Sequence, residues 1–151
     1  MKPPLPPRRY GLAIPALALA LSVTAAEKSG VRVVESFEVG ENVYVRALAV
    51  EKASNGLWVG TSVGALEIDL ATVRPRNSFT RQDGLANEYV FAIGIDSQGY
   101  KWFGTNAGGA ARYKDGKWKT YFPLHGLADY WIYSFQNDKD GNLWIGTWAG
   151  V

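Results

Sequence analysis

One tetrapeptide pattern, Trp-x-Gly-Thr, occurs three times in the 151 residues. The spacing of its copies constrains the fold more than any other feature. The copies are residues 58–61, 102–105 and 144–147, so successive tryptophans are 44 and 42 residues apart. Each copy follows a run of alternating apolar residues and a polar turn that contains glycine. A period of this length with several short strands is typical of a β-propeller blade. Because no segment after residue 26 shows apolar residues at helical spacing over a helix length, the sequence predicts an all-β fold.

The repeats predict blades of four antiparallel strands at residues 45–80 and 90–122, with a partial blade at 132–151. A second set of aromatic residues, Phe37, Phe79 and Tyr121, also recurs every 42 residues. It predicts an opening strand at 31–38 that completes the outermost position of the last blade. We therefore expect an incomplete propeller of about three blades. Since closure takes about four to eight blades, we expect exposed edges that further blades or another copy of the chain would cover.

The recurring tryptophans have a structural interpretation. A large ring on the second strand of each blade can fill the wedge between neighbouring sheets. Periodic apolar positions of a repeat protein normally belong to its core. We therefore expect Trp102 to be needed for folding and not for chemistry.

The first 26 residues predict a secretory signal peptide. They carry Lys2, Arg8 and Arg9 and no acidic residue, followed by an apolar run at 12–23 and small residues suited to cleavage. An uncleaved membrane anchor is the alternative, but residues 10–26, with Pro15 among them, are short for a span of about 20 residues. We expect a mature segment, 27–151, that is periplasmic or secreted. It would be anchored in the inner membrane if it belongs to a longer sensor, so membrane contact is expected only through the signal peptide or a C-terminal region beyond residue 151.

Composition excludes several classes of function. The chain has no cysteine and one histidine, His125, which excludes disulfides, thiolate metal sites, thiol nucleophiles and histidine pairs. Outside the signal segment there are 13 basic and 14 acidic residues, so the charge gives no argument for nucleic-acid binding. Residues 138–142 lack the glycine and glutamate positions of a calcium loop and are interpreted as a hairpin turn. We expect no catalytic residues, no metal, no cofactor and no nucleic-acid partner.

One face of the propeller is predicted to gather aromatic and polar side chains. Strands alternate in direction within a blade, so the loops before each first strand and the turns after each second strand lie at the same face. Aromatic platforms beside amide, carboxylate and hydroxyl groups suit a carbohydrate or another small extracellular ligand. The alternative is that the aromatics pack around the central axis. The predicted ligand-binding residues are Asn87, Tyr89, Thr105, Asn106, Tyr130, Trp131, Thr147 and Trp148.

The repeats resemble the two-component regulator propeller family. The segments DGLANEYVFAIGIDSQGYKWFGTNAGGAARY and HGLADYWIYSFQNDKDGNLWIGTWAGV follow the family's order of a Gly-Leu, a V-x-x-I-x-x-D-x-x-G stretch, L-W-I-G-T and a second Gly-Leu. The resemblance covers roughly residues 37–151. The first repeat departs from it, because Lys52 stands where the others have Asp96 and Asp138.

The resemblance implies an extracytoplasmic sensor propeller of the kind that precedes hybrid sensor histidine kinases and some diguanylate cyclases. In several such proteins the ligand is a breakdown product of a polysaccharide. The sequence contains no histidine-kinase box, ATP-binding glycine motif or receiver domain, so we expect a non-enzymatic, ligand-sensing segment of a phosphorelay sensor without its output domain. The alternatives are a secreted propeller that binds a polysaccharide or protein partner without signalling, and a non-functional gene fragment.

Overall fold

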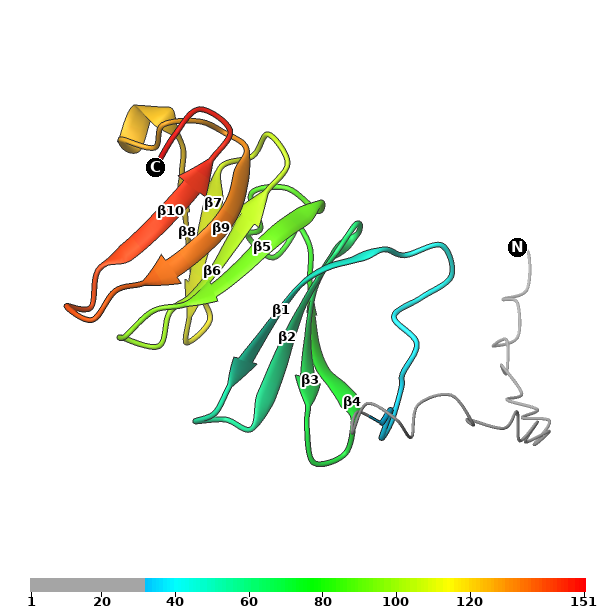
Figure 1. Ribbon diagram of the computed structural model, residues 1–151. Coiled ribbons are helices and arrows are strands. Elements are labelled where there is room, and N and C mark those ends of the chain that lie inside the picture. Colours follow the sequence, from blue (N-terminus) through cyan, green and yellow to red (C-terminus); the bar gives the residue numbers. More distant parts are fainter. Residues whose placement is uncertain (1–31) are drawn as a thin grey trace, which may run out of the picture. The chain divides into compact units, whose positions relative to one another are not determined.

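The computed structural model describes residues 32–151, and all of the strands described lie in the unit formed by Phe37–Val151 (Figure 1). The first sheet consists of β1 (Val45–Glu51), β2 (Gly56–Thr61), β3 (Gly64–Asp69) and β4 (Arg74–Phe79). The second consists of β5 (Val90–Ile95), β6 (Lys101–Thr105), β7 (Ala110–Lys114) and β8 (Lys117–Tyr121). The third consists of β9 (Ile132–Asn137) and β10 (Leu143–Thr147). A 3-10 turn, η1 (Pro123–His125), connects β8 to β9.

Neighbouring strands of each sheet are antiparallel and follow one another in chain order. Asp115 and Gly116, which join β7 to β8, have φ angles of +50° and +76°. Two residues with positive φ form the hairpin turn whose twist matches that of the flanking strands. The sheets confirm the prediction of an all-β chain built from four-stranded antiparallel blades and incomplete in its third blade.

Two sequence predictions fall at the start of the chain. The predicted signal peptide, residues 1–26, lies outside the described residues. Residues 32–38 form no strand, in contrast to the opening strand predicted at 31–38, and Val33 and Val34 are exposed. A strand is held by hydrogen bonds to a neighbouring strand. The expected neighbour was the third strand of the last blade, whereas the third sheet of the described residues consists of β9 and β10 alone.

The tryptophans of the repeated tetrapeptide pack each sheet against the next, as predicted. Trp58 on β2 is 1% exposed, and its ring centroid lies 5.7 Å from that of Phe103 in the second sheet. Trp102 on β6 is 8% exposed and lies 6.2 Å from Phe135 in the third sheet. Trp144 on β10 is 54% exposed. The same sequence position is therefore core at the two sheet junctions and surface on the last sheet.

The glycine of the same tetrapeptide lets the next sheet approach closely. A Cβ atom on Gly60 would lie 2.7 Å from a methyl carbon of Val90, and one on Gly104 would lie 2.6 Å from a methyl carbon of Ile132. Real Cβ atoms essentially never come so near another carbon. Since Val90 and Ile132 begin the first strand of the following sheet, the glycine sets the spacing between consecutive sheets.

In the second and third repeats, a carboxylate in the preceding turn holds the tetrapeptide tryptophan by its indole N–H. Trp102 Nε1 donates to Asp96 at 2.8 Å, and Trp144 Nε1 donates to Asp138 at 3.0 Å. The other oxygen of each aspartate accepts two backbone N–H groups of its own turn. One carboxylate thus fixes both the hairpin turn and the ring that packs against the next sheet. The hairpin interpretation of residues 138–142 agrees with these bonds.

The first repeat keeps this arrangement with a different residue. Glu51, one position before Lys52, accepts a hydrogen bond from the indole N–H of Trp58 at 2.9 Å. It also forms an ion pair with Lys101 at 2.9 Å. Partial burial raises the pKa of Glu51, but the hydrogen bonds from Trp58, Lys101 and Ser54 outweigh it and lower the pKa overall. The longer side chain of glutamate therefore compensates for the shifted position.

Trp102 is buried and Trp144 is exposed, so truncating the two side chains should lower the free energy of unfolding by different amounts. Trp102→Ala should lower the free energy of unfolding by about 3–5 kcal/mol, the usual cost of removing a buried aromatic ring. Trp144→Ala should cost much less, because this residue is 54% exposed and fills no junction between sheets. Urea unfolding followed by circular dichroism measures both. Equal losses would contradict the assignment of Trp102 to the junction between the second and third sheets.

The Asp138 carboxylate should make stability depend on pH in a defined window. Hydrogen bonds from the Asn142 side chain, the Trp144 indole and the turn backbone lower the pKa of Asp138 from 3.8 to about 2. A carboxyl whose pKa is lower in the folded state stabilises the fold above its unfolded pKa. This stabilisation is therefore lost as the pH falls from about 3.8 to about 2. Asp138→Asn should therefore flatten the fall in the free energy of unfolding across that range. The control is Asp140→Asn, which should leave that fall unchanged, because the Asp140 side chain makes no hydrogen bond within the described residues.

Candidate functional site

Equivalent residues at the start of each blade bring aromatic side chains together. Residues i and i+2 of a strand point to the same face. The first strands of the three sheets, β1, β5 and β9, lie next to one another. Two positions per repeat therefore meet on one surface, and their residues are Tyr44 and Arg46, Tyr89 and Phe91, and Trp131 and Tyr133.

The rings along this surface contact one another in sequence. Phe91 and Tyr133 are stacked, with ring centroids 5.4 Å apart and planes 11° from parallel. Tyr89 meets Phe91 edge-on at 5.2 Å, and Trp131 lies 6.3 Å from Phe91. Trp148, in the turn after β10, lies 6.3 Å from Tyr133. We call these five residues the aromatic row.

One end of the aromatic row borders a hollow of about 310 Å³ lined by Asp129, Trp131, Tyr133 and Trp148. Trp131 is 39% exposed and Trp148 is 76% exposed, so both rings offer free surface. One oxygen of Asp129 accepts the backbone N–H of Trp131 at 2.8 Å. Its other oxygen accepts no hydrogen bond from the described residues and can take a hydroxyl group. The hollow combines ring faces with a free carboxylate acceptor.

The other end of the row borders a shallower hollow of about 450 Å³ lined by Tyr44, Val45, Arg46 and Tyr89. The Arg46 guanidinium donates to the Tyr89 hydroxyl at 2.9 Å and lies 5.3 Å from the centre of that ring. It forms no ion pair with a carboxylate of the described residues. Arg46 therefore positions the Tyr89 ring and leaves a cation at this end of the row.

The structure places the predicted polar residues in supporting roles. Thr105 is fully buried, and its hydroxyl donates to the Gly109 carbonyl at 2.8 Å, while Thr147 donates to Gly150 in the same way. These hydroxyl groups close the turn after the second strand of each blade. The Asn87 side-chain oxygen accepts the backbone N–H of Tyr89 at 3.0 Å and so orders the loop before β5.

The remaining predicted residues divide between the row and its surroundings. Asn106 donates its backbone N–H to the carbonyl of Tyr89 at 3.0 Å, which joins the turn to the start of β5. Trp148 makes the equivalent bond to Trp131 at 3.0 Å. These bonds bring the predicted loops and turns to one face, as the strand directions require. Tyr130 is exposed, but its ring stacks 6.4 Å from Phe122 and takes no part in the row.

Sequence reasoning missed Arg46, Phe91 and Tyr133. The signal was present, because each lies two residues after the aromatic residue that precedes the first strand of its blade, namely Tyr44, Tyr89 and Trp131. Strand alternation puts such a pair on one face. No group of three His, Asp or Glu side chains among residues 32–151 could hold a metal ion. Within the same residues, no helix has the length and hydropathy to span a bilayer.

Comparison with known proteins gives one family match. Residues 126–149 match the two component regulator propeller family. This segment contains the last tetrapeptide and the Gly-Leu that precedes β9. A search of curated protein sequences found no match.

Solved structures with the same fold include several extracellular domains. The chain shares 27% identity and a TM-score of 0.66 with the extracellular domain of BT3049, described as a hybrid two component system, from B. thetaiotaomicron. It shares 17% identity and a TM-score of 0.60 with that of BT4673 from B. thetaiotaomicron, and 23% and 0.56 with PorZ, a surface component of the type-IX secretion system of Porphyromonas gingivalis. These matches cover 74%, 69% and 70% of this chain and 16% of each solved structure.

The comparisons agree with the repeats read from the sequence. The family match falls on one tetrapeptide repeat, and the structural matches extend over about two thirds or more of the chain. The 27% identity links the chain to an extracellular domain of a hybrid two component system. The resemblance is supported: residues 126–149 match the two component regulator propeller family, and the fold matches that of an extracellular domain of a hybrid two component system.

Proposed function

We propose that this chain is the extracytoplasmic, ligand-sensing propeller segment of a two-component sensor protein, and that its ligand is a carbohydrate. The observation that carries the proposal is the aromatic row, which places Trp131, Tyr133 and Trp148 around one hollow. Exposed contiguous aromatic surface on a folded domain normally marks a binding site. The similarity to the extracellular domain of a hybrid two component system supports the sensing role.

The chemistry of the row favours a sugar ring over a purely apolar ligand. A sugar has apolar C–H faces that stack on aromatic rings and a rim of hydroxyl groups that need hydrogen bonds. The hollow supplies the rings of Trp131 and Trp148 for stacking. It supplies the free oxygen of Asp129 and the Tyr133 hydroxyl for the rim. The alternative role of these rings is packing around the propeller axis, which the thermal transition of the Trp148 variant tests.

The main alternative is a secreted propeller that binds a saccharide or protein without signalling. The gene sequence downstream of codon 151 separates the two. Further W-x-G-T repeats, a membrane span and a kinase or cyclase domain would support the sensor. A stop codon after a few more blades would contradict the sensor and favour the secreted binder.

Truncation of the rings that line the hollow should weaken carbohydrate binding. Trp131→Ala and Trp148→Ala should each reduce affinity about thirtyfold or more, since an aromatic anchor contributes about 2 kcal/mol. The matched control is Trp144→Ala, because Trp144 is similarly exposed and lies outside the hollow. The probes are linear glucan, xylan and mannan tetrasaccharides, measured by calorimetry with the full chain.

Two results would overturn the proposal. One is that Trp144→Ala weakens binding as much as Trp131→Ala does. The other is that no saccharide of the panel binds the unaltered chain while circular dichroism shows it folded. The thermal transition of the Trp148 variant should stay close to that of the unaltered chain, because its ring is 76% exposed.

A further inference from the structure

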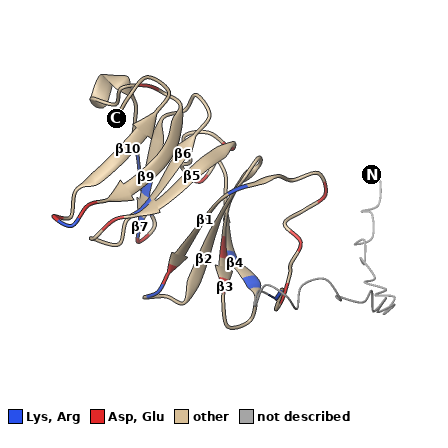
Figure 2. Cartoon of the chain, viewed as in Figure 1, with Lys and Arg blue, Asp and Glu red and all other residues tan. Residues whose placement is uncertain are grey.

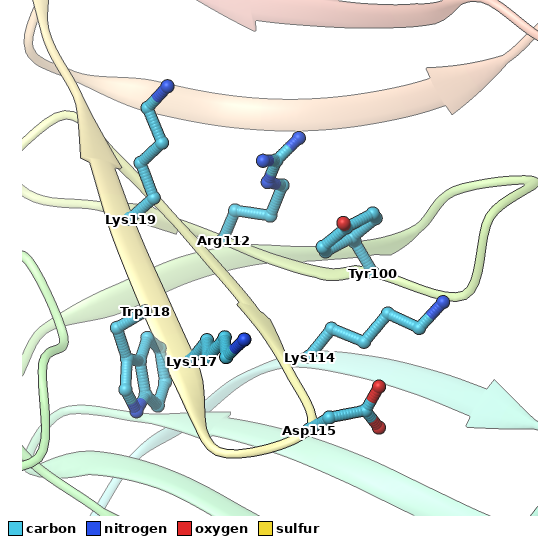
Figure 3. Close-up of a pocket in the computed structure, with 7 residues that line it drawn as sticks. All are labelled: Tyr100, Arg112, Lys114, Asp115, Lys117, Trp118 and Lys119. Atoms are coloured by element: carbon cyan, nitrogen blue, oxygen red, sulfur yellow. The ribbon is translucent and has the colours of Figure 1, made fainter.

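A third hollow, on β7, β8 and the turn before β6 in the second blade, is lined mostly by cations. Its volume is about 310 Å³, and its lining is Tyr100, Arg112, Lys114, Asp115, Lys117, Trp118 and Lys119 (Figure 3). Four of these residues are basic and one is acidic. Figure 2 shows basic positions on β7, and Figure 3 shows the Arg112 and Lys119 side chains extending in the same direction from neighbouring strands. We call this hollow the basic hollow.

Aromatic rings and a carbonyl group, not carboxylates, contact three of these cations, Arg112, Lys114 and Lys119. The Arg112 guanidinium lies 4.2 Å from the centre of the Tyr100 ring and within 5.6 Å of two further rings. Lys119 lies 4.9 Å from the Tyr121 ring, and Lys114 donates to the Gln98 carbonyl at 2.7 Å. None of the four cations forms an ion pair within the described residues. Arg112, Lys114 and Lys119 are therefore held by contacts that leave their charge uncompensated.

The first blade shows that the repeat does not require cations here. Arg112 lies opposite Trp102 on the neighbouring strand just as Glu67 lies opposite Trp58, so these positions are equivalent. In the first blade Glu67 is neutralised by Arg76 at 3.5 Å. The same place in the fold therefore accepts an acidic residue with its own partner.

The neighbouring positions also carry cations in the second blade and uncharged or acidic residues in the first. Lys119 faces Arg112 across the sheet at the position that Asn77 occupies in the first blade. Lys114 corresponds to Asp69, two residues further along the third strand of each blade. Lysines on an edge strand can protect it from pairing with other chains. That explanation fits Lys119 on the outermost strand, but it does not account for Arg112 on the interior strand β7.

We propose that the basic hollow binds an anionic polysaccharide through its sulfate or carboxylate groups. Ordered cations without partners favour oxyanions, and a guanidinium can bind two oxygens of one such group. Outside the signal segment the chain has nearly balanced charge, so the positive field is local and suits a few anionic groups more than a long nucleic acid. This site is separate from the aromatic row and does not depend on the function proposed for that row.

The first blade supplies the variant that tests this proposal. Arg112→Glu combined with Lys119→Asn recreates the pair that the first blade carries, in which Asn77 donates to Glu67 at 2.7 Å. The matched control is Lys139→Asn, an exposed lysine in the turn between β9 and β10. The probes are a short fluorescent dextran sulfate, a neutral dextran of the same length and an oligothymidylate of the same charge, each titrated against the full chain.

The proposal predicts that dextran sulfate binds and that neutral dextran does not. The double variant should lose at least about tenfold in affinity, the effect of removing charge-assisted hydrogen bonds of about 1.5 kcal/mol. The dependence of log affinity on log salt should fall by about 1 for each cation removed, which a merely structural role would not produce. Lys139→Asn should change neither quantity, and circular dichroism should show that both variants are folded.

Three outcomes would overturn the proposal. The first is that the double variant, still folded, binds dextran sulfate as tightly as the unaltered chain. The second is that oligothymidylate binds as tightly as dextran sulfate, which would make the ligand a polyanion without preference for saccharides. The third is no binding of dextran sulfate at low salt. A failure of the tetrasaccharide experiment on the aromatic row would leave these outcomes unaffected.

Discussion

The hydrogen bond from each tetrapeptide indole to a carboxylate at the end of the first strand or directly after it is the interaction on which the blades depend. In the second repeat Asp96 fixes its own hairpin and at the same time holds Trp102 in the wedge between sheets. A buried indole N–H without an acceptor would cost about 1–3 kcal/mol. The carboxylate removes that cost and sets the orientation of the ring. Turn geometry and the packing of consecutive sheets are thereby controlled by one side chain.

This division leaves one side of the first strand of each blade without a part in the core. The second strand supplies the tryptophan for the core, the glycine for close approach and the threonine for the following turn. Val90 and Ile132 of the first strands belong to the core, but the neighbouring side chains of Trp131 and Tyr133 are exposed, and that of Tyr89 is half-buried. Repetition then multiplies one aromatic position into a row, because first strands of consecutive blades lie side by side. The aromatic row, which we propose binds ligand, thus arises from the same periodicity that builds the core.

Much of the fold could be predicted from the sequence, because the tetrapeptide marks the second strand and the alternation marks the first. The site could be predicted only in part. Thr105 belongs to a repeated motif, and its hydroxyl closes a turn in every copy, which spacing alone cannot distinguish from a role in binding. Glu51 escaped detection because a longer side chain reaches the same indole from one position earlier. The predicted opening strand depends on a partner strand, and pairing between distant segments is not encoded in local pattern.

The central claim is that tryptophans of the second strands are structural and those near the first strands bind ligand. Fluorine NMR of the chain labelled with 5-fluorotryptophan tests it directly, since the six tryptophans give separate signals that single substitutions assign. During titration with the tetrasaccharide that binds best, the account predicts shifts for Trp131 and Trp148. The signals of Trp58, Trp102 and Trp144 should stay in place. Shifts of Trp58 or Trp102 without shifts of Trp131 and Trp148 would contradict the account.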